Sequence, residues 1–348
     1  MATHQLGPER YMFNLDWYDE QAGLIRKFTL SYFPVTREIE MYDVKNVRIF
    51  LKKMEIPSIQ LEDFYVGSKV TILSRAMKVT DYGDVRTRQR FEEFRGRTFA
   101  MIKPDSYQNI GKIINEASAA GFDINKLKMS KFSKDTAGQF YAEHQGKPFF
   151  DNLTNFMCGD VCVGMELCST DAVAKWRQVI GPTNSENAKR EAPSSVRAKF
   201  GTDGTRNAVH GSDSSVSQKR ESEFFFGGMT PADRPMQTTA VMDNCTLCLI
   251  KPHVVKEGLA GQVIDAILEA GFEISAMEMF NLSRPVIEEF YEVYKHVLPE
   301  YLPLIEHMTN GPLIALEVRQ NDAVNAFRDF CGPHDPEIAK HIRKNTLR

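Results

Sequence analysis

Residues 207–214 bring together side chains that chemistry on a phosphate group would need. They read N-A-V-H-G-S-D-S, so that His210 follows a short apolar run and precedes a glycine. Ser212, Asp213 and Ser214 come next, and side chains of these types cap helix N-termini. The free N–H groups and partial positive charge of a helix N-terminus favour phosphate. The sequence therefore predicts a phosphate-accepting histidine at a strand-to-helix junction; a capped surface-loop histidine is the alternative.

The composition is that of an ordinary soluble globular protein. The 348 residues carry a net charge of −3, with 42% hydrophobic and 26% charged side chains. These values predict two or three domains and give no electrostatic reason to expect a nucleic-acid or membrane surface. No apolar run approaches the roughly 20 residues that cross a bilayer, and residues 1–10 lack the apolar segment of a signal peptide. We therefore expect the cytoplasm, or a compartment continuous with it.

The six cysteines do not have the spacing of a disulfide framework. Cys158, Cys162 and Cys168 fall in or beside an apolar run, whereas Cys245 and Cys248 form a C-x-x-C. A C-x-x-C can bind zinc or perform redox chemistry, but no second pair follows at zinc spacing. Because C-T-L-C-L-I is typical of a buried strand, we expect small core residues here and no metal held by the protein alone.

The first ninety residues alternate apolar and polar side chains, as antiparallel strands do. Residues 11–18 and 24–32 flank a turn that ends in glycine, which indicates a hairpin; residues 39–51 and 66–79 continue the pattern. No cluster of catalytic groups occurs here, and 15 Lys and Arg balance 14 Asp and Glu over residues 1–95. We expect a small β-barrel or sandwich that binds through shape and apolar contacts.

After a short charged connector at residues 92–97, the chain repeats itself with a period near 150 residues. T-F-A-M-I-K-P from Thr98 matches T-L-C-L-I-K-P from Thr246. Further matched segments begin at Ala120 and Ala270, Phe140 and Phe290, Asp171 and Asp322, and Gly181 and Gly332. The offset rises only from 148 to 151 residues, so small insertions alone separate two copies of one domain.

Each copy alternates strands and helices. In the first copy we expect strands at 98–102, 122–130 and 161–168, helices at about 108–120, 134–144 and 170–179, and a further strand before His210. This order predicts a split β-α-β arrangement of ferredoxin-like type with an antiparallel sheet. No G-x-G-x-x-G or Walker A motif occurs, so side chains and helix ends must bind any phosphate. Residues 227–242, with two glycines and two prolines, should link the copies.

With I-K-P-D at residues 102–105 and N-x-x-H-G-S-D-S at residues 207–214, the chain resembles the nucleoside diphosphate kinase family. The resemblance covers residues 92–348, in two copies. The first ninety residues resemble the doublet-microtubule module of axonemal proteins, which has a pleckstrin-homology-like fold. An α+β chain is implied, with a β module at residues 1–91, a complete kinase-like ferredoxin-like domain at 92–237 and a C-terminally incomplete one at 238–348.

Members of this family move the γ-phosphate of a nucleoside triphosphate to a diphosphate by a ping-pong route through a phosphohistidine. The resemblance makes His210 the nucleophile, with Glu221 orienting the ring through its other nitrogen and Ser212 beside it. It assigns phosphate clamping to Lys103, Arg177 and Arg197, phosphate binding to Thr183, positioning of Lys103 and the histidine to Tyr141, sugar binding to Asn207 and base stacking to Phe149. Mg²⁺ would accompany the nucleotide, held mainly by phosphate oxygens and water.

The second copy departs from this pattern. Four residues keep the family types at matching positions: Lys251, Tyr291, Arg328 and Arg348. His334, however, replaces the threonine, and the sequence shown ends at the counterpart of Arg197, before any counterpart of His210. We expect a scaffold or a silent, vestigial nucleotide site in this copy.

The assembly expected from the sequence also differs from that of ordinary family members. Residues 181–197 are three residues longer than the usual family loop, which contributes to subunit contacts. We therefore do not expect the usual hexamer. Two copies in one chain can instead pack on each other as a pseudo-dimer and bury the surfaces that identical subunits share.

Two functional classes remain open from the sequence. The first is a phosphotransferase of the cytoplasm and cytoskeleton, associated with microtubules of cilia, axonemes and centrosomes. The second is a non-catalytic microtubule-associated protein of the doublet interior with residual nucleotide sites. The resemblance implies tubulin, axonemal doublet proteins and the γ-tubulin ring complex as partners, beside nucleoside di- and triphosphates. Nuclease activity ranks third, because no paired-carboxylate metal cluster can be placed in the sequence.

Overall fold

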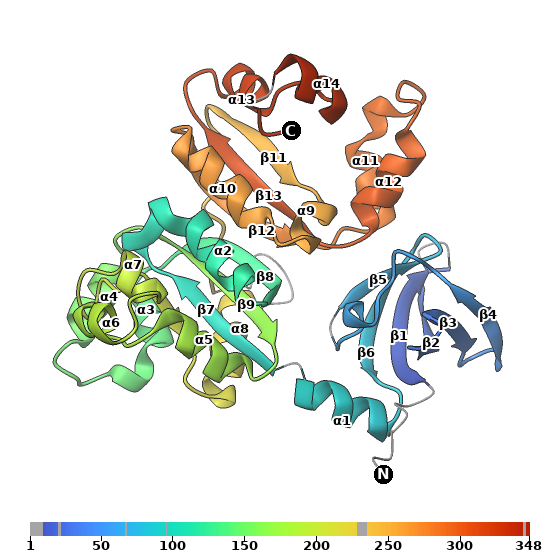
Figure 1. The fold of residues 1–348 in the computed structure, drawn as a ribbon, viewed down its shortest axis with the longest axis horizontal. Helices are drawn as coiled ribbons and strands as arrows, with labels where there is room; N and C mark the ends of the chain where they lie inside the picture. The colour runs from blue at the N-terminus through green and yellow to red at the C-terminus, as the bar shows by residue number, and fades with distance from the viewer. Residues whose placement is uncertain (1–9, 20–21, 67, 95, 228–234, 344–345) are drawn as a thin grey trace, which may run out of the picture. The chain divides into compact units, whose positions relative to one another are not determined.

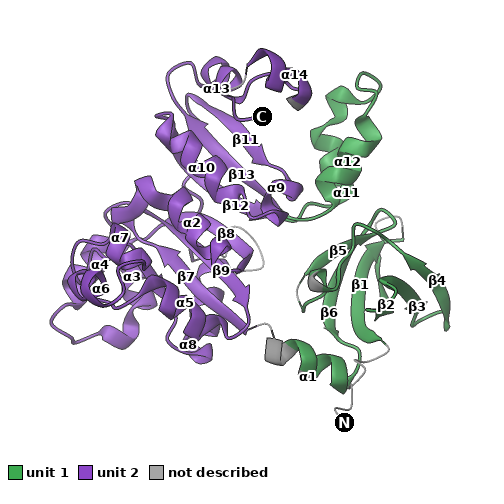
Figure 2. Cartoon of the chain, viewed as in Figure 1, with its two compact units in different colours: residues 1–94, 281–312 green, residues 95–280, 313–348 purple. Residues whose placement is uncertain are grey.

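The computed structural model describes residues 10–19, 22–66, 68–94, 96–227, 235–343 and 346–348. Contacts group the chain into two compact units, residues 1–94 with 281–312 and residues 95–280 with 313–348 (Figure 2). The three-part division at residues 91 and 237 stays a prediction. Among the residues described, no helix is both long enough and apolar enough to cross a membrane.

Six antiparallel strands form the N-terminal β module (Figure 1). They are β1 (Tyr11–Asp19), β2 (Leu24–Phe33), β3 (Glu38–Asp43), β4 (Arg48–Glu55), β5 (Lys69–Ile72) and β6 (Arg75–Tyr82), in the sheet order β4-β3-β2-β1-β6-β5. A short 3-10 turn, η1 (Leu61–Asp63), precedes β5. The predicted alternation places Phe13, Leu15, Phe28 and Leu30 in the core, each no more than 1% exposed. The antiparallel strands predicted for this module are confirmed.

A helix that the sequence did not reveal follows β6. α1 (Val85–Phe94) includes the start of residues 92–97, so the prediction of a connector there was wrong. Phe91 is 7% exposed and packs edge-on against Tyr11 and Phe13, with ring centroids 5.3 Å apart in both pairs. The charged side chains around Phe91 weaken the apolar periodicity, and packing on the module stabilises the helix instead.

A helical hairpin of the second repeat belongs to the same unit as the β module. It consists of α11 (Arg284–Phe290), the 3-10 turn η5 (Glu292–Tyr294) and α12 (Tyr301–Thr309). Strand β5 holds it, because Thr71 Oγ1 donates to the Thr309 carbonyl at 2.5 Å and Lys69 Nζ donates to the Asn281 carbonyl at 3.2 Å.

The second unit is built on one seven-stranded antiparallel sheet in the order β10-β7-β9-β8-β12-β13-β11 (Figure 1). The first repeat supplies β7 (Gly96–Ile102), β8 (Asp123–Lys131), β9 (Val161–Ser169) and β10 (Val209–Gly211). The second repeat supplies β11 (Cys245–Ile250), β12 (Glu273–Phe280) and β13 (Leu313–Arg319). The matching orders β7-β9-β8 and β11-β13-β12 confirm the predicted ferredoxin-like arrangement, and Cys245 and Cys248 lie on a strand as expected.

Helices cover this sheet. The first repeat contains η2 (Pro104–Asn109), α2 (Ile110–Ala119), α3 (Lys134–Phe140), η3 (Ala142–His144), α4 (Phe150–Met157), α5 (Ala172–Ile180), α6 (Ser185–Glu191), α7 (Val196–Phe200) and α8 (Ser215–Phe226). The second contains α9 (Pro252–Lys256), α10 (Ala260–Glu269), α13 (Ala323–Cys331) and α14 (Pro336–Ile342). The sequence did not predict α4, α6 and α7, because helices of five to eight residues are too short for a periodic signal.

The two repeats pack on each other within this unit, as expected of a pseudo-dimer. Glycines on α2 and α10, Gly111 and Gly261, allow the two helix backbones to approach closely. A Cβ atom on Gly111 would come closer than 3.0 Å to backbone atoms of Gly261 and Asp265. Tyr107 adds a polar contact, since its hydroxyl donates to the Ile274 carbonyl at 3.0 Å and accepts the Ile274 N–H at 2.8 Å.

The predicted linker at residues 227–242 is tied to both repeats over its described part; residues 228–234 lie outside the described residues. Met236 is fully buried, and its carbonyl accepts a hydrogen bond from Lys128 Nζ of β8 at 2.5 Å. The N–H groups of Val241 and Met242 donate to the carboxylate of Glu317 on β13 at 2.7 and 3.1 Å. The described residues 235–242 thus belong to the packed unit.

We predict that Gly111→Ala lowers the free energy of unfolding, because the added methyl group has no room between α2 and α10. Overpacking of this kind typically costs about 1–3 kcal/mol. Gly138→Ala in α3 is the matched control, since nothing lies within 4 Å of its Cβ position and the change should stabilise the helix by up to about 1 kcal/mol. Urea denaturation measures both; equal stability of the two variants would contradict the close helix contact.

Candidate active site

Two segments that lie a hundred residues apart in the sequence meet at the edge of the sheet. His210 on β10 stands opposite Met101 on β7. The Lys103 N–H donates to the Ala208 carbonyl at 2.8 Å, and the Ala208 N–H donates to Asp105 Oδ2 at 3.0 Å. These bonds hold Ala208 at a φ of 67°, which a residue with a side chain rarely adopts. The lysine and histidine motifs therefore form one backbone structure.

Helix α8 places a carboxylate against the histidine ring. Ser214 is its N-cap, and its hydroxyl accepts the Ser217 N–H at 3.2 Å. Glu221, 3% exposed, accepts the Ser212 hydroxyl on Oε2 at 2.6 Å, and its Oε1 lies 3.0 Å from Nε2 of His210. This second contact is short but not aligned as a hydrogen bond; such contacts often align only when substrate binds. Because Nε2 faces Glu221, Nδ1 is the nitrogen that can attack a phosphate.

Aromatic rings limit the movement of the imidazole. The centroids of Phe99, Phe140 and Tyr141 lie 6.1, 5.6 and 6.1 Å from that of His210. Its side chain remains 20% exposed, so the ring is held in place but can be reached from the cavity beside it.

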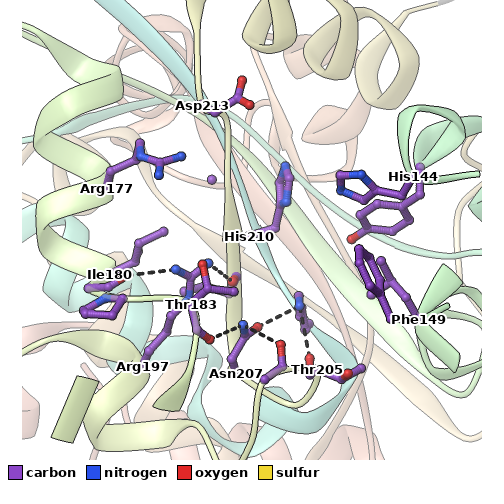
Figure 3. A pocket seen from close by; sticks show the side chains of 18 of the residues that line it. His144, Phe149, Arg177, Ile180, Thr183, Arg197, Thr205, Asn207, His210 and Asp213 are labelled. Atoms are coloured by element: carbon purple, nitrogen blue, oxygen red, sulfur yellow. Dashed lines mark hydrogen bonds between the residues drawn. The ribbon is translucent and has the colours of Figure 1, made fainter. Parts of the chain in front are cut away.

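That cavity has a volume of about 550 Å³ (Figure 3). Nine residues to which the resemblance assigned catalytic or binding roles line it: Lys103, Tyr141, Phe149, Arg177, Thr183, Arg197, Asn207, His210 and Glu221. Ser212 is fully buried behind Glu221. The structure therefore brings together every candidate of the first repeat, although it assigns different contacts to some of them.

Lys103 is a buried cation, 6% exposed, at the floor of the cavity. Its Nζ donates to Asn207 Oδ1 at 2.7 Å and to the Thr205 carbonyl at 3.1 Å. Burial and the nearby Arg197 guanidinium lower the pKa of Lys103 to about 8, opposed by the carboxylates of Asp105 and Asp203. An anionic phosphate in the cavity would favour the charged form further.

The contact expected between Tyr141 and Lys103 is not formed. The Tyr141 hydroxyl is buried and has no hydrogen-bond partner among the described residues, and burial raises the pKa of Tyr141. Asn207 positions the lysine instead, since its Oδ1 accepts from Lys103 while its Nδ2 donates to the carbonyls of Thr183 at 2.8 Å and Gly204 at 3.1 Å. Both ends of the Asn207 amide are thus engaged, and its sugar-binding role stays a prediction.

Arg197 is a second buried cation, 9% exposed. Its Nη1 donates to the Gly181 carbonyl at 2.8 Å and its Nη2 to the Val209 carbonyl at 3.1 Å. Burial, with a contribution from Arg177, lowers the pKa of Arg197 to about 10. The guanidinium therefore stays charged at neutral pH and is oriented before any ligand arrives. Arg177 itself is exposed on the cavity wall.

Aromatic side chains line the mouth of the cavity. Phe149 is 46% exposed, and its ring centroid lies 5.6 Å from that of His144. The His144 ring in turn stacks on Tyr141 at 6.1 Å, with an angle of 20° between the planes. An exposed phenyl ring on this wall can stack on a base of any identity, which is the role predicted for Phe149.

Several cavity residues were missed by sequence reasoning. Glu143 and His144 line the wall next to Tyr141, and Thr205 accepts from Lys103 through its carbonyl. Arg220 lies within 3.6 Å of Glu221 Oε1. Their proximity in sequence to predicted residues was the only available signal. Glu143, His144 and Thr205 lie on a 3-10 turn or a loop, where no spacing rule shows where a side chain points; Arg220 directly precedes Glu221 on α8 but does not line the cavity.

The second repeat retains part of this arrangement. Arg348 Nη1 donates to the Gly332 carbonyl at 3.0 Å, as Arg197 does to Gly181 in the first repeat. Burial, and then Arg348, lower the pKa of Lys251. Arg328 is exposed on α13. Tyr291 belongs to the other compact unit, where its ring centroid lies 4.9 Å from that of Phe290.

Comparison with known proteins covers almost the whole chain. The family model "Nucleoside diphosphate kinase" matches residues 96–230 and 244–348, and "Nucleoside diphosphate kinase 7 N-terminal PH domain" matches residues 5–93. These matches confirm the predicted fold class, a pleckstrin-homology-like module followed by ferredoxin-like kinase domains.

Individual relatives agree with these matches. The chain is 45% identical to nucleoside diphosphate kinase homolog 7 of Rattus norvegicus, over 98% of this chain and 86% of that protein. It is 43% identical to the nucleoside diphosphate kinase of Aquifex aeolicus, over 38% of this chain and 95% of that protein. A crystal structure of the Aquifex aeolicus enzyme covers 39% of this chain and 97% of its own, with 42% identity and a TM-score of 0.38.

We predict that Arg197→Ala lowers the rate of phosphoryl transfer about 100-fold or more, because a preorganised donor to developing charge is typically worth about 3 kcal/mol of barrier. A phosphate-binding arginine whose side chain stayed solvated would contribute little to stability. The buried side chain and its two backbone hydrogen bonds instead predict a loss of about 1–3 kcal/mol in the free energy of unfolding.

The exposed Arg190 on α6 provides the control, since its side chain is 71% exposed. Arg190→Ala should change neither turnover nor stability appreciably. Turnover assays under conditions where urea denaturation shows each variant to be folded distinguish the two effects. Undiminished turnover of folded Arg197→Ala would show that this guanidinium does not bind the transferring phosphate.

Proposed function

The chain belongs to the nucleoside diphosphate kinase family, and we propose that its first repeat, residues 92–237, is a working phosphotransferase. The observation that carries the proposal is the imidazole of His210, which lies in a cavity with its Nε2 against a buried carboxylate; two buried cations, Lys103 and Arg197, line the same cavity. Nucleoside triphosphates would be the donors and nucleoside diphosphates the acceptors.

In the first half-reaction, the lone pair of His210 Nδ1 attacks the γ-phosphorus of the triphosphate. A P–N bond forms while the bond from that phosphorus to the β–γ bridging oxygen breaks, and the diphosphate leaves with the electron pair. Glu221 stabilises the positive charge that develops on the ring and holds the Nε2 proton. In the second half-reaction, a terminal oxygen of another diphosphate takes the phosphoryl group and the neutral imidazole is restored.

Lys103 and Arg197 would stabilise the charge on the transferring group, because both are oriented by internal hydrogen bonds before substrate enters. Arg177 and Thr183 would bind the remaining phosphates from the exposed wall, and Phe149 would stack on the base. Fixed donors in a partly dehydrated cavity need little reorganisation during the reaction. Catalysis on this view is positioning and electrostatic stabilisation.

Mg²⁺ is expected to enter with the nucleotide. Over the part of the chain that the structure describes, no group of three or more His, Cys, Asp or Glu side chains could hold a metal ion. Phosphate oxygens and water would therefore supply most of its ligands, with Asp213 as a carboxylate on the cavity wall. Hydrogen bonds from Ser217 and Ser214 lower the pKa of Asp213, so it is ionised at neutral pH. The ion neutralises phosphate charge when bound.

The β module suggests a second role, which is compatible with the first. We propose that residues 1–91 attach the chain to microtubules of cilia, axonemes and centrosomes, through tubulin, axonemal doublet proteins or the γ-tubulin ring complex. Support comes from the resemblance of these residues to the doublet-microtubule module of axonemal proteins. Exposed apolar side chains on the strands are available for binding: Tyr18 at 58%, Ile25 at 59% and Ile49 at 54%. The alternative is a non-catalytic structural protein of the doublet interior, with the cavity as a residual nucleotide site.

We predict that γ-labelled ATP transfers its label to His210 alone within this sequence. The phosphoryl group should be acid-labile and base-stable, as expected of a phosphoramidate. His210→Ala should lose the label, whereas His144→Ala, which alters the other histidine of the cavity, should retain it. Labelling of His210→Ala at the native rate would contradict the assignment, and an unlabelled native chain would favour the structural alternative.

We predict that a chain starting at Gly96 keeps phosphoryl transfer but loses most microtubule association. The start follows α1, which packs on the module. Because the charges of the module nearly balance, association of the full chain should weaken little as salt rises. Co-sedimentation of both chains at low and high salt measures this. Undiminished association of the shortened chain would move the targeting role to the kinase-like repeats.

A further inference from the structure

Arg220 places a guanidinium beside the carboxylate that orients the nucleophile. Its Nη2 lies 3.6 Å from Oε1 of Glu221, the same oxygen that lies 3.0 Å from Nε2 of His210. The other oxygen of Glu221 already accepts the Ser212 hydroxyl. Glu221 is 3% exposed, so water screens these interactions little. The imidazole and the guanidinium therefore share one carboxylate oxygen.

Glu143 attracts the same guanidinium from another element. Its Oε2 lies 3.1 Å from Nη2 of Arg220. Glu143 belongs to η3, directly after Tyr141, and lines the cavity. The side chains of Arg220 and Glu143 are 43% and 46% exposed, so this pair contributes little to stability. The position of the pair matters for a different reason, because the same nitrogen of Arg220, Nη2, faces the carboxylates of both Glu143 and Glu221.

We propose that Arg220 is a positioning residue. Its guanidinium interacts with both Glu143 and Glu221, and the balance between these two interactions sets how strongly Glu221 stabilises positive charge on His210. The inference rests on the proposed phosphotransfer and adds two residues to it. Neither residue touches the reacting atoms; Arg220 acts through Glu221, and Glu143 acts through Arg220.

The two carboxylate contacts predict shifts of opposite sign. Without Arg220, the negative charge of Glu221 acts on the imidazole alone and favours the protonated ring. Only the neutral ring can attack, so phosphoenzyme formation should then require a higher pH. Without Glu143, Arg220 interacts with Glu221 alone and weakens the stabilisation of the protonated ring. Phosphoenzyme formation should then proceed at lower pH. If Arg220 and Glu143 had only a structural role, the two variants would not shift the pH dependence in opposite directions.

Other charged or titratable groups face this arrangement from neighbouring elements: Lys103, Tyr141, His144, Arg177, Arg197 and Asp213. All of them stay unchanged in the variants, so the difference between variants reports on Arg220 and Glu143. Lys219 offers a matched control. It is exposed on the same helix, and Lys219→Gln removes the same charge without touching Glu221.

The experiment measures the rate of phosphoenzyme formation by the full chain, with saturating labelled ATP and Mg²⁺, as a function of pH. The acid-side midpoint should rise by about 0.5 unit in Arg220→Gln and fall by a similar amount in Glu143→Gln. Arg220→Lys keeps the charge and should stay close to the native midpoint. The double variant should follow Arg220→Gln, because Glu143 acts only through the arginine.

The outcomes separate this inference from the proposed function. Absence of phosphoenzyme in the native chain would overturn the phosphotransfer itself. A labelled native chain whose two variants shift in the same direction, or no further than Lys219→Gln, would overturn the role of Arg220 alone. Circular dichroism checks folding of every variant. Should Arg220→Gln fail to fold, a downward shift in Glu143→Gln beside an unchanged midpoint in Lys219→Gln supports the role of Arg220, and no shift in Glu143→Gln overturns it.

Discussion

The pairing of β10 with β7 is the constraint on which the site depends. Three short contacts join the segments: Lys103 N–H to the Ala208 carbonyl, Ala208 N–H to Asp105 Oδ2, and Lys103 Nζ to Asn207 Oδ1. They hold Ala208 in a left-handed conformation and leave His210 on a three-residue edge strand. Asp105 therefore supports the nucleophile although it lies outside the cavity lining.

Two buried cations dominate the electrostatics of the site, and hydrogen bonds to carbonyl and amide oxygens offset the cost of burying their charges. Lys103 and Arg197 are almost fully buried, and burial lowers the pKa of both. Each remains charged near neutral pH because it donates hydrogen bonds to carbonyl or amide oxygens, which solvate it in place of water. Two like charges near one cavity disfavour each other, so an anionic phosphate between them relieves this repulsion.

The two repeats share one fold, but their equivalent helical segments belong to different compact units. Close contact of α2 and α10 through Gly111 and Gly261 joins the repeats into one sheet-bearing unit. In the first repeat the helical segment α3–η3–α4 lies over the site and supplies Tyr141, Glu143 and Phe149. In the second repeat the equivalent hairpin, α11–η5–α12, is held by β5 of the N-terminal module. The module thereby contacts this hairpin, and it also carries exposed apolar side chains of its own.

The sequence by itself determined the chemical types and their order: the motif around His210, the I-K-P-D segment, the two copies and the alternating strands. These are local or periodic features, and spacing along the chain is enough to recognise them. Tertiary structure alone decided that Asn207 rather than Tyr141 positions Lys103, that Arg197 is buried, and that α1 forms where a connector was expected. It also decided that Arg220 faces both Glu143 and Glu221. Burial and side-chain direction depend on residues distant in sequence, so no pattern within one segment contains them.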